Sequence, residues 1–279
     1  MKAGEALRQA TRRLAQAGVP DARHDARTLL GEVMDLAQLE VLSAQDRPLD
    51  AADLARFFDL VARRAAREPL QYLLGRAYFM GHAFLVAPGV LIPRQDSEAL
   101  AQRALVLAGK GARVLDLCCG SGCLGISLKL ARPDAEVFAG DIAPEAIRLA
   151  RDNAQRLGAD ISLRQGDLFA PFEGLRFDII VCNPPYIPTG ELPHLQAEVR
   201  HEPALALDGG PDGLAVYRRV LNRAARFLNP GGRLLLETGD GQAGALRALV
   251  PRDFAPPRVH PDLSGLPRVL ETGLPDSVQ

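Results

Sequence analysis

A polar, conformationally restricted tetrapeptide, Asn183-Pro184-Pro185-Tyr186, follows an apolar run that starts at Phe177. The run has the pattern of a buried strand in a parallel sheet. Proline has no backbone N–H and restricts the residue before it to extended conformations, so the tetrapeptide marks the end of that strand. Open α/β sheets bind ligands at the carboxyl ends of their strands, which makes this tetrapeptide a candidate site.

These four residues suit the binding of a planar nitrogen group. The lone pair of an amide or exocyclic amino nitrogen is delocalised, so the group reacts only when acceptors hold its N–H bonds and its lone pair faces an electrophile. Asn183 offers a side-chain carbonyl and Pro184 a backbone carbonyl, while Pro185 stiffens the turn and Tyr186 provides an aromatic wall. The pattern predicts alkylation of such a nitrogen, with Asn183, Pro184 and Tyr186 as catalytic residues. A strand-ending turn without chemistry is the alternative.

A glycine-rich turn lies between another apolar run and a helical run. It reads CCGSGCLG and contains G-x-G-x-x-G at Gly120, Gly122 and Gly125. Backbone N–H groups in such a turn approach nucleotide-type ligands closely. Asp141 lies about 20 residues later, where a carboxylate accepts hydrogen bonds from ribose hydroxyls. The motif fits a nicotinamide-dependent dehydrogenase, and it also fits a tight turn in which Asp141 only caps the next helix.

Two further carboxylates favour a cationic nucleoside ligand. Asp116 ends the first strand beneath the loop, where its charge would repel a pyrophosphate and attract a cation. Asp167 follows the third strand, where it would accept from an adenine amino group while Leu168 lines the ring. We therefore expect S-adenosylmethionine as the cofactor and S-adenosylhomocysteine as its product. The predicted cofactor-binding residues are Asp116, Cys118, Cys119, Gly120, Ser121, Gly122, Asp141, Ile142, Asp167, Leu168 and Asn183.

The chain after residue 93 alternates between strand-like and helical runs. Helical periodicity starts near Cys123, at Pro144 and near Gly213, and a short apolar run precedes each start. Such alternation predicts a doubly wound, mostly parallel sheet of the α/β class. Residues 93–279 are therefore expected to form the cofactor-binding domain.

Residues 1–74 differ in pattern and are expected to form a small helical domain. Apolar residues recur there at helical spacing without strand-like alternation. One helix is predicted from Ala51 to Arg67, with Asp50 as its N-cap. Residues 75–92 hold aromatic and β-branched residues around glycines, which predicts a linking β-hairpin.

Composition limits the partners of this chain. Its 34 acidic and 33 basic residues nearly balance, so we expect no stable binding of nucleic acid. No apolar run reaches the roughly 20 residues of a membrane span, and the first residues lack the pattern of a leader segment, which predicts a cytoplasmic protein. The four cysteines lack the paired spacing of a zinc site, so no metal is expected.

Several segments along the chain form a specific combination. They are EPLQYLLG, PGVLIPRQDSE, VLDLCCGSG, GDLF, NPPY, VRHEPALALDGGPDGL and DLSGLPRVL. Together, and over nearly the whole chain, they resemble the release-factor glutamine methyltransferases, the HemK/PrmC-type family of class I S-adenosylmethionine-dependent methyltransferases. The resemblance implies a Rossmann-like domain preceded by a helical domain that docks the substrate and by a connecting hairpin.

The resemblance also implies a reaction. The family methylates the side-chain amide nitrogen of the glutamine in the Gly-Gly-Gln motif of bacterial class I release factors. We expect release factors as partners and a monomeric enzyme. The residues implied for the cofactor are Gly120, Ser121, Gly122, Asp141, Leu168 and Asn183, and those implied for the substrate glutamine run from Asn183 to Tyr186.

Two departures from the family pattern stand out. Cys118 and Cys119 replace the usual Gly-Thr of the cofactor loop. The hairpin motif of the family usually reads Pro-Arg-Pro-Glu-Thr-Glu, whereas in this chain Arg94 is followed by Gln-Asp-Ser-Glu, which ends at Glu98. Arg94 and Glu98 are predicted either to line the substrate pocket or to form a surface pair.

Three other functions use the same residues. Enzymes that methylate a glutamine of a ribosomal protein share the chemistry and the "RHEP" segment. A DNA or RNA adenine methyltransferase also suits Asn-Pro-Pro-Tyr, and it would need a basic cleft and a flipped base. A binding module that keeps the cofactor pocket without activity is the third alternative.

Overall fold

The computed structural model describes residues 1–275 and separates them into two compact units. The first unit holds Met1–Arg76 together with a short distant segment, Gln196–His201. The second unit holds Ala77–Leu195 and the chain from Glu202 onward. The short segment was not expected to belong with the N-terminal residues.

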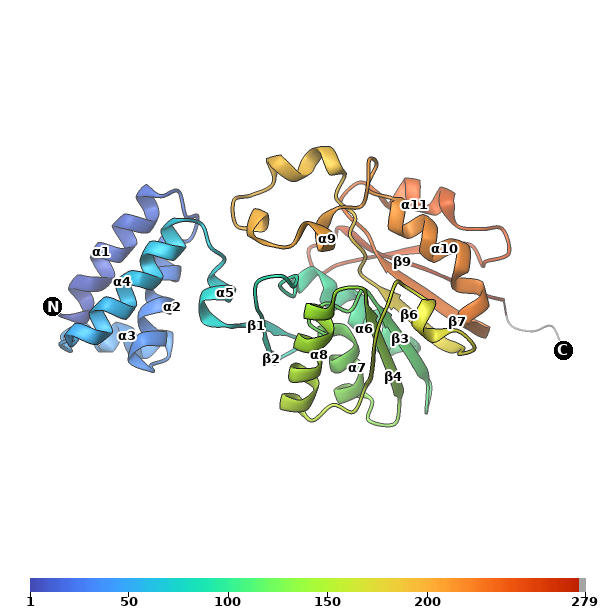
Figure 1. The fold of residues 1–279 in the computed structure, drawn as a ribbon, viewed down its shortest axis with the longest axis horizontal. Helices are drawn as coiled ribbons and strands as arrows, with labels where there is room; N and C mark the ends of the chain where they lie inside the picture. Colours follow the sequence, from blue (N-terminus) through green and yellow to red (C-terminus); the bar gives the residue numbers. More distant parts are fainter. Residues whose placement is uncertain (276–279) are drawn as a thin grey trace. The chain divides into compact units, whose positions relative to one another are not determined.

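The first unit is helical, and its elements are drawn in blue and cyan in Figure 1. The helices are α1 (Ala3–Gln16), α2 (Ala22–Met34), α3 (Gln38–Ser43), α4 (Ala51–Ala65) and α5 (Leu70–Leu74). Asp50 caps α4 as predicted, because its side chain accepts a hydrogen bond from the Asp53 N–H at 2.8 Å. Helix α4 ends at Ala65 rather than at Arg67, and α3 was not predicted. The core is formed by apolar side chains from α1, α2 and α4.

An ion-pair cluster holds the distant segment in the first unit. Arg64 donates to Asp25 at 2.7 Å and to Glu198 at 2.8 Å. Arg67 donates to Glu198 at 2.7 Å and 2.6 Å. Asp25 and Arg64 are buried, so each charge depends on its partner.

The second unit is built on a seven-stranded sheet with the order β5-β4-β3-β6-β7-β9-β8. Its first five strands in this order pair in parallel, and β9 pairs antiparallel with β7 and β8. This is the doubly wound, mostly parallel sheet predicted from the sequence, with an antiparallel edge that was not predicted. The strands are β3 (Arg113–Leu117), β4 (Glu136–Asp141), β5 (Ser162–Gln165), β6 (Phe177–Cys182), β7 (Leu228–Glu237), β8 (Arg258–Pro261) and β9 (Pro267–Gly273).

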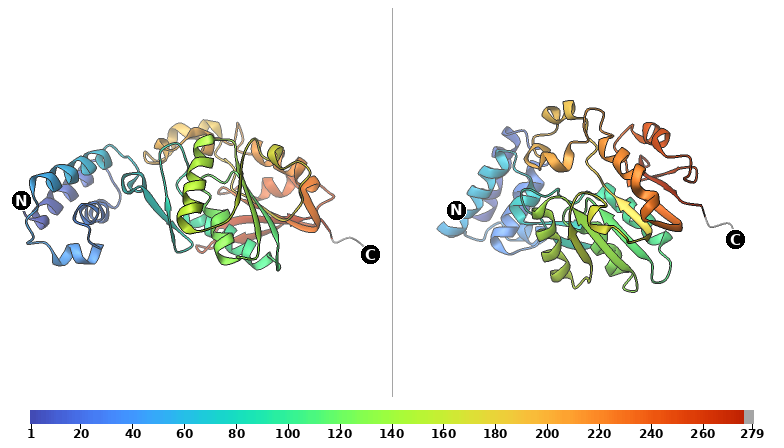
Figure 2. Two further views of the ribbon diagram at one scale, coloured as in Figure 1. Left: turned by 60° about the horizontal axis from the view of Figure 1, so that its bottom comes forward. Right: turned by 45° about the vertical axis from the view of Figure 1, so that its right-hand side comes forward.

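Helices cover both faces of this sheet (Figures 1 and 2). Alternate residues of the central strands face opposite ways: Leu115 packs in one core with Tyr217, whereas Val114 packs in the other with Leu100 and Leu124. Burial on both faces explains why the central strands are continuously apolar. The helices are α6 (Glu98–Leu107), α7 (Cys123–Ala131), α8 (Pro144–Leu157), α9 (Ala204–Leu207), α10 (Ala215–Phe227) and α11 (Ala243–Leu249).

The expected hairpin is present as a small two-stranded sheet of β1 (Arg76–Phe79) and β2 (His82–Leu85). Asn153 of α8 fixes β2, because its side chain accepts from the Leu85 N–H at 2.7 Å and donates to the Leu85 carbonyl at 3.1 Å.

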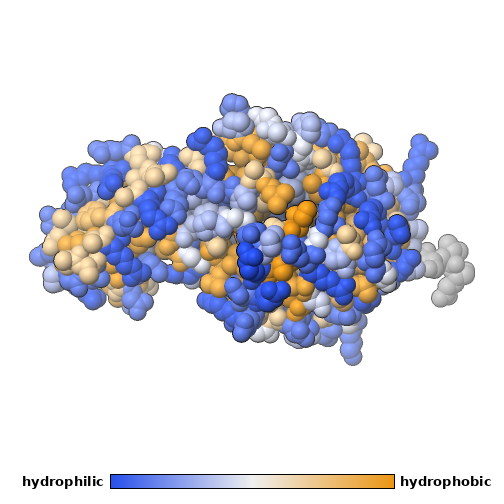
Figure 3. All heavy atoms as spheres, viewed as in Figure 1, coloured by the Kyte–Doolittle hydropathy of each residue, from blue (hydrophilic) through white to orange (hydrophobic). Residues whose placement is uncertain are grey.

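Hydrophilic and apolar residues are interspersed over the face seen in Figure 3. Within residues 1–275, no helix combines the length and the apolar character that crossing a membrane requires.

Candidate active site

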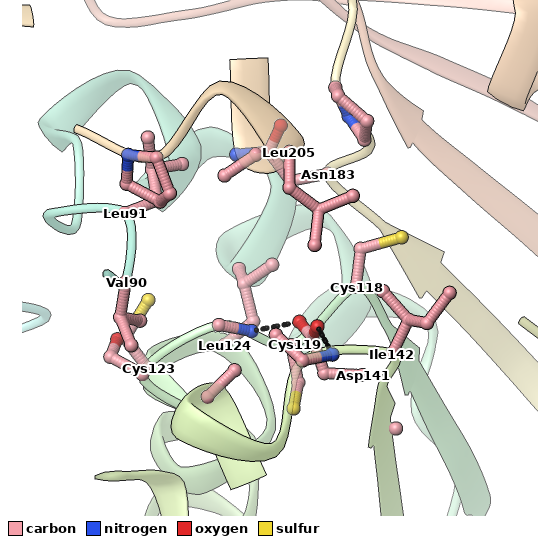
Figure 4. A pocket seen from close by; sticks show the side chains of 18 of the residues that line it. Val90, Leu91, Cys118, Cys119, Cys123, Leu124, Asp141, Ile142, Asn183 and Leu205 are labelled. Carbon is pink, nitrogen blue, oxygen red and sulfur yellow. Dashed lines mark hydrogen bonds between the residues drawn. The ribbon is translucent and has the colours of Figure 1, made fainter. Parts of the chain in front are cut away.

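The predicted site residues meet at the carboxyl edge of the sheet. Strand β3 lies between β4 and β6, and Leu117 is in register with Gly140 on one side and Cys182 on the other. The segments that follow these three strands therefore lie next to one another. They line a cavity, open to solvent, that Figure 4 shows from close by.

Most, but not all, of the predicted residues line this cavity. Asp116, Gly122, Pro184, Tyr186 and Glu98 lie outside its lining. Those in the lining are Arg94, Cys118, Cys119, Gly120, Ser121, Asp141, Ile142, Asp167, Leu168, Asn183 and Pro185.

The glycine loop has backbone φ angles that are unfavourable for residues other than glycine. Gly120 and Gly122 have φ values of 54° and 79°, in the left-handed region that favours glycine. A Cβ on Gly122 would lie 2.9 Å from Ile126 Cδ1 and 3.0 Å from Ala150 Cβ. Gly122 thus allows the loop and α8 to pack closely behind the cavity.

Cys118 occupies a glycine-like position in the same loop. Its φ is 59°, which explains physically why a glycine is usual there and why a cysteine bears some backbone strain. Its Sγ lies 4.0 Å from Cys182 Sγ, at the end of β6. The substitution therefore keeps the loop path and places a thiol in the cavity wall.

Asp141 braces the loop through both of its carboxylate oxygens (Figure 4). The Gly120 N–H donates to Oδ2 and the Ala143 N–H donates to Oδ1, each at 2.9 Å. Burial raises the pKa of Asp141, and these backbone hydrogen bonds oppose the rise. Each oxygen keeps a further lone pair for a hydroxyl in the cavity.

Asp116 lies beneath the loop, fully buried, and does not line the cavity. One oxygen accepts the Gly125 N–H at 2.9 Å, and the other has no partner within residues 1–275. Burial raises the pKa of Asp116 to about 7. Its observed contact is with the start of α7, and a contact with a ligand remains a prediction.

Asp167 has a protein partner at the cavity mouth. Arg219 of α10 donates to its carboxylate at 2.5 Å, and both side chains are exposed. Leu168 beside it is buried and has a φ of 48°, so this turn is also locally strained. The sequence did not indicate the Arg219 pairing, and the adenine contact of Asp167 remains a prediction.

Asn183 points into the cavity from the end of β6 (Figure 4). Its Nδ2 donates to Ser97 Oγ at 3.1 Å. Pro184 is buried and Tyr186 is partly buried. Burial raises the pKa of Tyr186, so its hydroxyl stays protonated.

The backbone of the tetrapeptide is held from behind by three residues of the chain's second half. Gln242 donates to the Tyr186 carbonyl at 2.8 Å. A Cβ on Gly209 would lie 2.7 Å from Tyr186 Cα, and a Cβ on Gly213 would lie 2.3 Å from the Tyr186 carbonyl oxygen. The glycines of the "DGGPDG" segment therefore allow this segment to support the tetrapeptide.

Arg94 and Glu98 have different partners and do not pair with each other. Arg94 forms an ion pair with Glu202, which also accepts the Ile92 N–H at 3.0 Å. Glu98 accepts the Met80 N–H at 2.7 Å. Arg94 is the member of the predicted pair that reaches the cavity.

Several residues of the site were missed by sequence reasoning. Ser97 and Glu202 are buried polar residues whose partners lie far away in the chain. Asn153 is fully buried and donates to the Ser121 carbonyl at 3.0 Å. Asn153 lies three residues after the buried Ala150 of α8 and so on the same face of the helix. A polar residue on the apolar face of a predicted helix was the signal in the sequence that could have identified Asn153.

Two family models match the chain. A PrmC N-terminal domain model matches residues 5–75, and a methyltransferase domain model matches residues 108–256. Within residues 1–275, no group of three or more His, Cys, Asp or Glu residues is arranged to hold a metal ion.

Curated relatives cover nearly the full length. The chain is 46% identical to a release factor glutamine methyltransferase of Geobacter sulfurreducens, over 92% of this chain and 91% of the relative. It is 42% identical to one of Cereibacter sphaeroides, over 99% of each.

Solved structures share the fold at low identity. A methyltransferase from Pyrococcus furiosus aligns with a TM-score of 0.55 at 18% identity, over 71% of this chain and 91% of that chain. A 16S rRNA methyltransferase from T. thermophilus, solved in complex with AdoMet and guanosine, aligns with a TM-score of 0.51 at 24% identity, over 71% of this chain and 49% of that chain. Together with the length and identity of the curated matches, these findings place the chain in the family of release factor glutamine methyltransferases.

Proposed function

We propose that this chain transfers a methyl group from S-adenosylmethionine to the side-chain amide nitrogen of the glutamine in the Gly-Gly-Gln motif of peptide chain release factors. One observation carries the proposal: Asn183 lines the same cavity as the glycine loop and Asp141. A carbonyl acceptor for an amide thus lies beside a nucleoside-type site.

The cavity residues fit S-adenosylmethionine. The backbone of Gly120 and Ser121 forms one wall, and the free lone pairs of the Asp141 carboxylate suit ribose hydroxyls. Ile142 and Leu168 supply apolar surface for an adenine ring. When bound there, S-adenosylmethionine supplies a methyl group already activated by the adjacent sulfonium.

Asn183 and Pro184 position the substrate amide. We infer that Asn183 Oδ1 and the Pro184 backbone carbonyl accept its two N–H bonds, which directs the nitrogen lone pair toward the interior of the cavity. Pro184 has no N–H of its own to compete. Orientation of this kind contributes up to about 7–11 kcal/mol to a barrier. The rim of the cavity that includes Arg94 and Pro185 would hold the neighbouring substrate backbone, and Tyr186 would complete the wall.

The test is a transfer assay with labelled cofactor. We expect a release factor to gain one methyl group on the motif glutamine, and a release factor with glutamate at that position to gain none. Ribosomal protein and adenine-containing DNA and RNA serve as competing acceptors. Preferential labelling of any of these, or equal labelling of both release factors, would overturn the assignment.

Asn183→Ala tests the carbonyl acceptor directly. Because the side chain contacts the substrate amide rather than the bulk of the cofactor, we expect the cofactor Kd to change less than about threefold and kcat to fall at least about a hundredfold, in line with the loss of a positioned charge-stabilising group. Asn229→Ala is the matched control, since Asn229 donates to Asp178 at 2.8 Å and does not line the cavity. Equal turnover in both variants would remove Asn183 from the mechanism.

We also propose the organisation that goes with this function. Residues 1–74 would dock the release factor, residues 75–92 would connect the two domains, and residues 93–279 would carry out the transfer. A substrate of translation termination implies a cytoplasmic location. The site residues all belong to one chain, so a monomer suffices, and we expect sedimentation to give a mass near 30.0 kDa.

A further inference from the structure

Asn153 is the only polar side chain among the five buried residues of α8. It is fully buried. A buried carboxamide costs stability unless its oxygen and its N–H bonds have partners. An apolar residue would satisfy the packing of α8 on the sheet, so the partners of Asn153 indicate what its amide does.

The whole amide of Asn153 is bonded to the backbone. Its Oδ1 accepts the Leu85 N–H at 2.7 Å. Its Nδ2 donates to the Leu85 carbonyl at 3.1 Å and to the Ser121 carbonyl at 3.0 Å. A backbone N–H only donates and a backbone carbonyl only accepts, so these partners fix which way the amide faces. One side chain therefore holds the end of β2 and the glycine loop at the same time.

The two segments held by Asn153 lead to two walls of the cavity. Residues 89–94, which begin four positions after Leu85, form one wall, and the glycine loop forms the other. Figure 4 shows Val90 in this cavity. A Cβ on Gly120 would lie 3.9 Å from Val90 Cγ1, so the two walls approach each other closely. Asn153 lies behind both walls and is not part of the cavity lining.

The bond to Ser121 also fixes the orientation of one peptide group in the loop. The Ser121 carbonyl and the Gly122 N–H belong to the same peptide plane. The Gly122 N–H donates to the Cys119 carbonyl at 2.8 Å, so Asn153 holds one end of this plane and Cys119 holds the other. Without Asn153, the Ser121 carbonyl would be a buried acceptor that has lost its donor, and the loop would have to move to reach water.

We propose that Asn153 is a positioning residue for the cofactor, which holds the glycine loop and residues 89–94 at the spacing that S-adenosylmethionine needs. All of these residues belong to the second unit. The inference goes beyond the proposed reaction and rests on the proposed placement of S-adenosylmethionine in this cavity. Because linkage is reciprocal, bound cofactor should in turn stabilise the bonds between Asn153 and Leu85.

The test compares Asn153→Leu with Arg156→Met. Leucine has nearly the size of asparagine but makes none of the three hydrogen bonds. Arg156 is on the same helix and donates to the Ala83 carbonyl of β2 at 2.7 Å rather than to the loop. Arg156→Met therefore weakens the attachment of β2 to α8 and leaves the bond to Ser121 in place, which makes it the matched control.

In Asn153→Leu we expect the Kd of S-adenosylhomocysteine and the KM for S-adenosylmethionine to rise at least about tenfold, because a buried carbonyl of the binding loop loses its donor. With a release factor and saturating cofactor, kcat should stay within about threefold, since no bond to Asn183 is removed. Arg156→Met should change the Kd and the KM less than about twofold. A general folding defect would lower kcat without raising the KM. An unchanged Kd in Asn153→Leu, or an equal rise in both variants, would overturn the proposal.

Amide exchange in the wild type tests the reciprocal effect and does not depend on any variant folding. We expect NMR to show that S-adenosylhomocysteine slows exchange of the Leu85 N–H at least about threefold more than that of the Ala255 N–H. The Ala255 N–H donates to the Gly273 carbonyl at 2.8 Å, and Ala255 is outside the cavity lining. The Gly120 N–H should slow as well, because it belongs to the loop.

The exchange pattern separates this inference from the proposed function. Slowing at Gly120 without the excess at Leu85 would overturn the role of Asn153 and leave the cofactor placement intact. If S-adenosylhomocysteine binds and neither amide slows, the cofactor placement is wrong and the role of Asn153 is overturned with it. The expected pattern without methyl transfer to a release factor would support the role of Asn153 and overturn the proposed function alone.

Discussion

The buried carboxyl group of Asp116 gives the stability of this protein a pH dependence that can be measured. Burial raises its pKa from 3.8 to about 7. Between these two pH values the folded protein keeps the proton while the unfolded chain releases it, so the unfolded state binds fewer protons. Raising the pH through this window therefore favours unfolding, and the loss is complete above the folded-state pKa.

The size of the effect follows from the shift. One pKa unit corresponds to about 1.4 kcal/mol, so this group lowers the free energy of unfolding by about 3 kcal/mol between about pH 5 and about pH 8. Asp116→Asn keeps an oxygen to accept the Gly125 N–H but cannot ionise. The stability of the variant relative to the wild type should therefore rise by about 3 kcal/mol over the same interval.

Urea unfolding at the two pH values, followed by circular dichroism, measures this difference. The denaturant slope should be the same in both proteins, because the surface exposed on unfolding does not change. Asp134→Asn is the control: an Arg132 hydrogen bond holds the pKa of the exposed Asp134 at about 2, so its carboxyl is ionised in both states throughout this interval. If Asp116→Asn and the wild type differ by the same amount at both pH values, the carboxyl is not desolvated in the folded protein and the reasoning fails.

Two further substitutions test the support of the site and the first unit. Gly213→Ala places a Cβ 2.3 Å from the Tyr186 carbonyl oxygen and should lower kcat about a hundredfold by displacing the tetrapeptide. The control is Gly174→Ala, at a φ of 81° with no atom within 4 Å of a new Cβ, which should leave kcat unchanged. Equal kcat in the two variants would contradict the close contact. Arg64→Met leaves the buried Asp25 carboxylate, now 2.7 Å from the Arg64 Nε, without its partner and should lower the free energy of unfolding by about 3–5 kcal/mol. Urea unfolding measures this loss, and the double variant Arg64→Met, Asp25→Asn should recover most of the lost stability. If Arg64→Met alone costs less than about 1 kcal/mol, the range of an exposed ion pair, then the pair is solvated.

Local sequence predicted the elements and their order because local chemistry decides them. Proline without an N–H ends β6 before Asn183, and glycine at positive φ marks the loop after β3. Alternation of strands and helices then predicts a parallel sheet, and parallel strands bring their carboxyl ends to one edge. These steps were sufficient to bring Gly120, Asp141 and Asn183 to one cavity.

Partners that lie far apart in the chain could not be predicted in this way. Ser97 and Asn183 are 86 positions apart, and Arg94 and Glu202 are 108 apart. Whether such side chains meet depends on the register of strands and on how connecting segments cross the sheet edge. For the same reason the sequence did not indicate that Arg219 pairs with Asp167 or that Glu198 belongs with the helices of the first unit.

The sequence by itself determined the class of fold, the glycine-rich loop after β3 and the strand-ending tetrapeptide at 183–186, because each depends on the backbone preferences of a few neighbouring residues. Only the tertiary structure decided which way the Asn183 amide faces and which carboxylates reach the cavity. Those outcomes depend on donors and acceptors contributed by separate elements, namely Ser97 before α6, which accepts from Asn183, and Arg219 of α10, which pairs with Asp167. A buried polar side chain takes the orientation that its partners allow, and its partners are known only once the chain is folded.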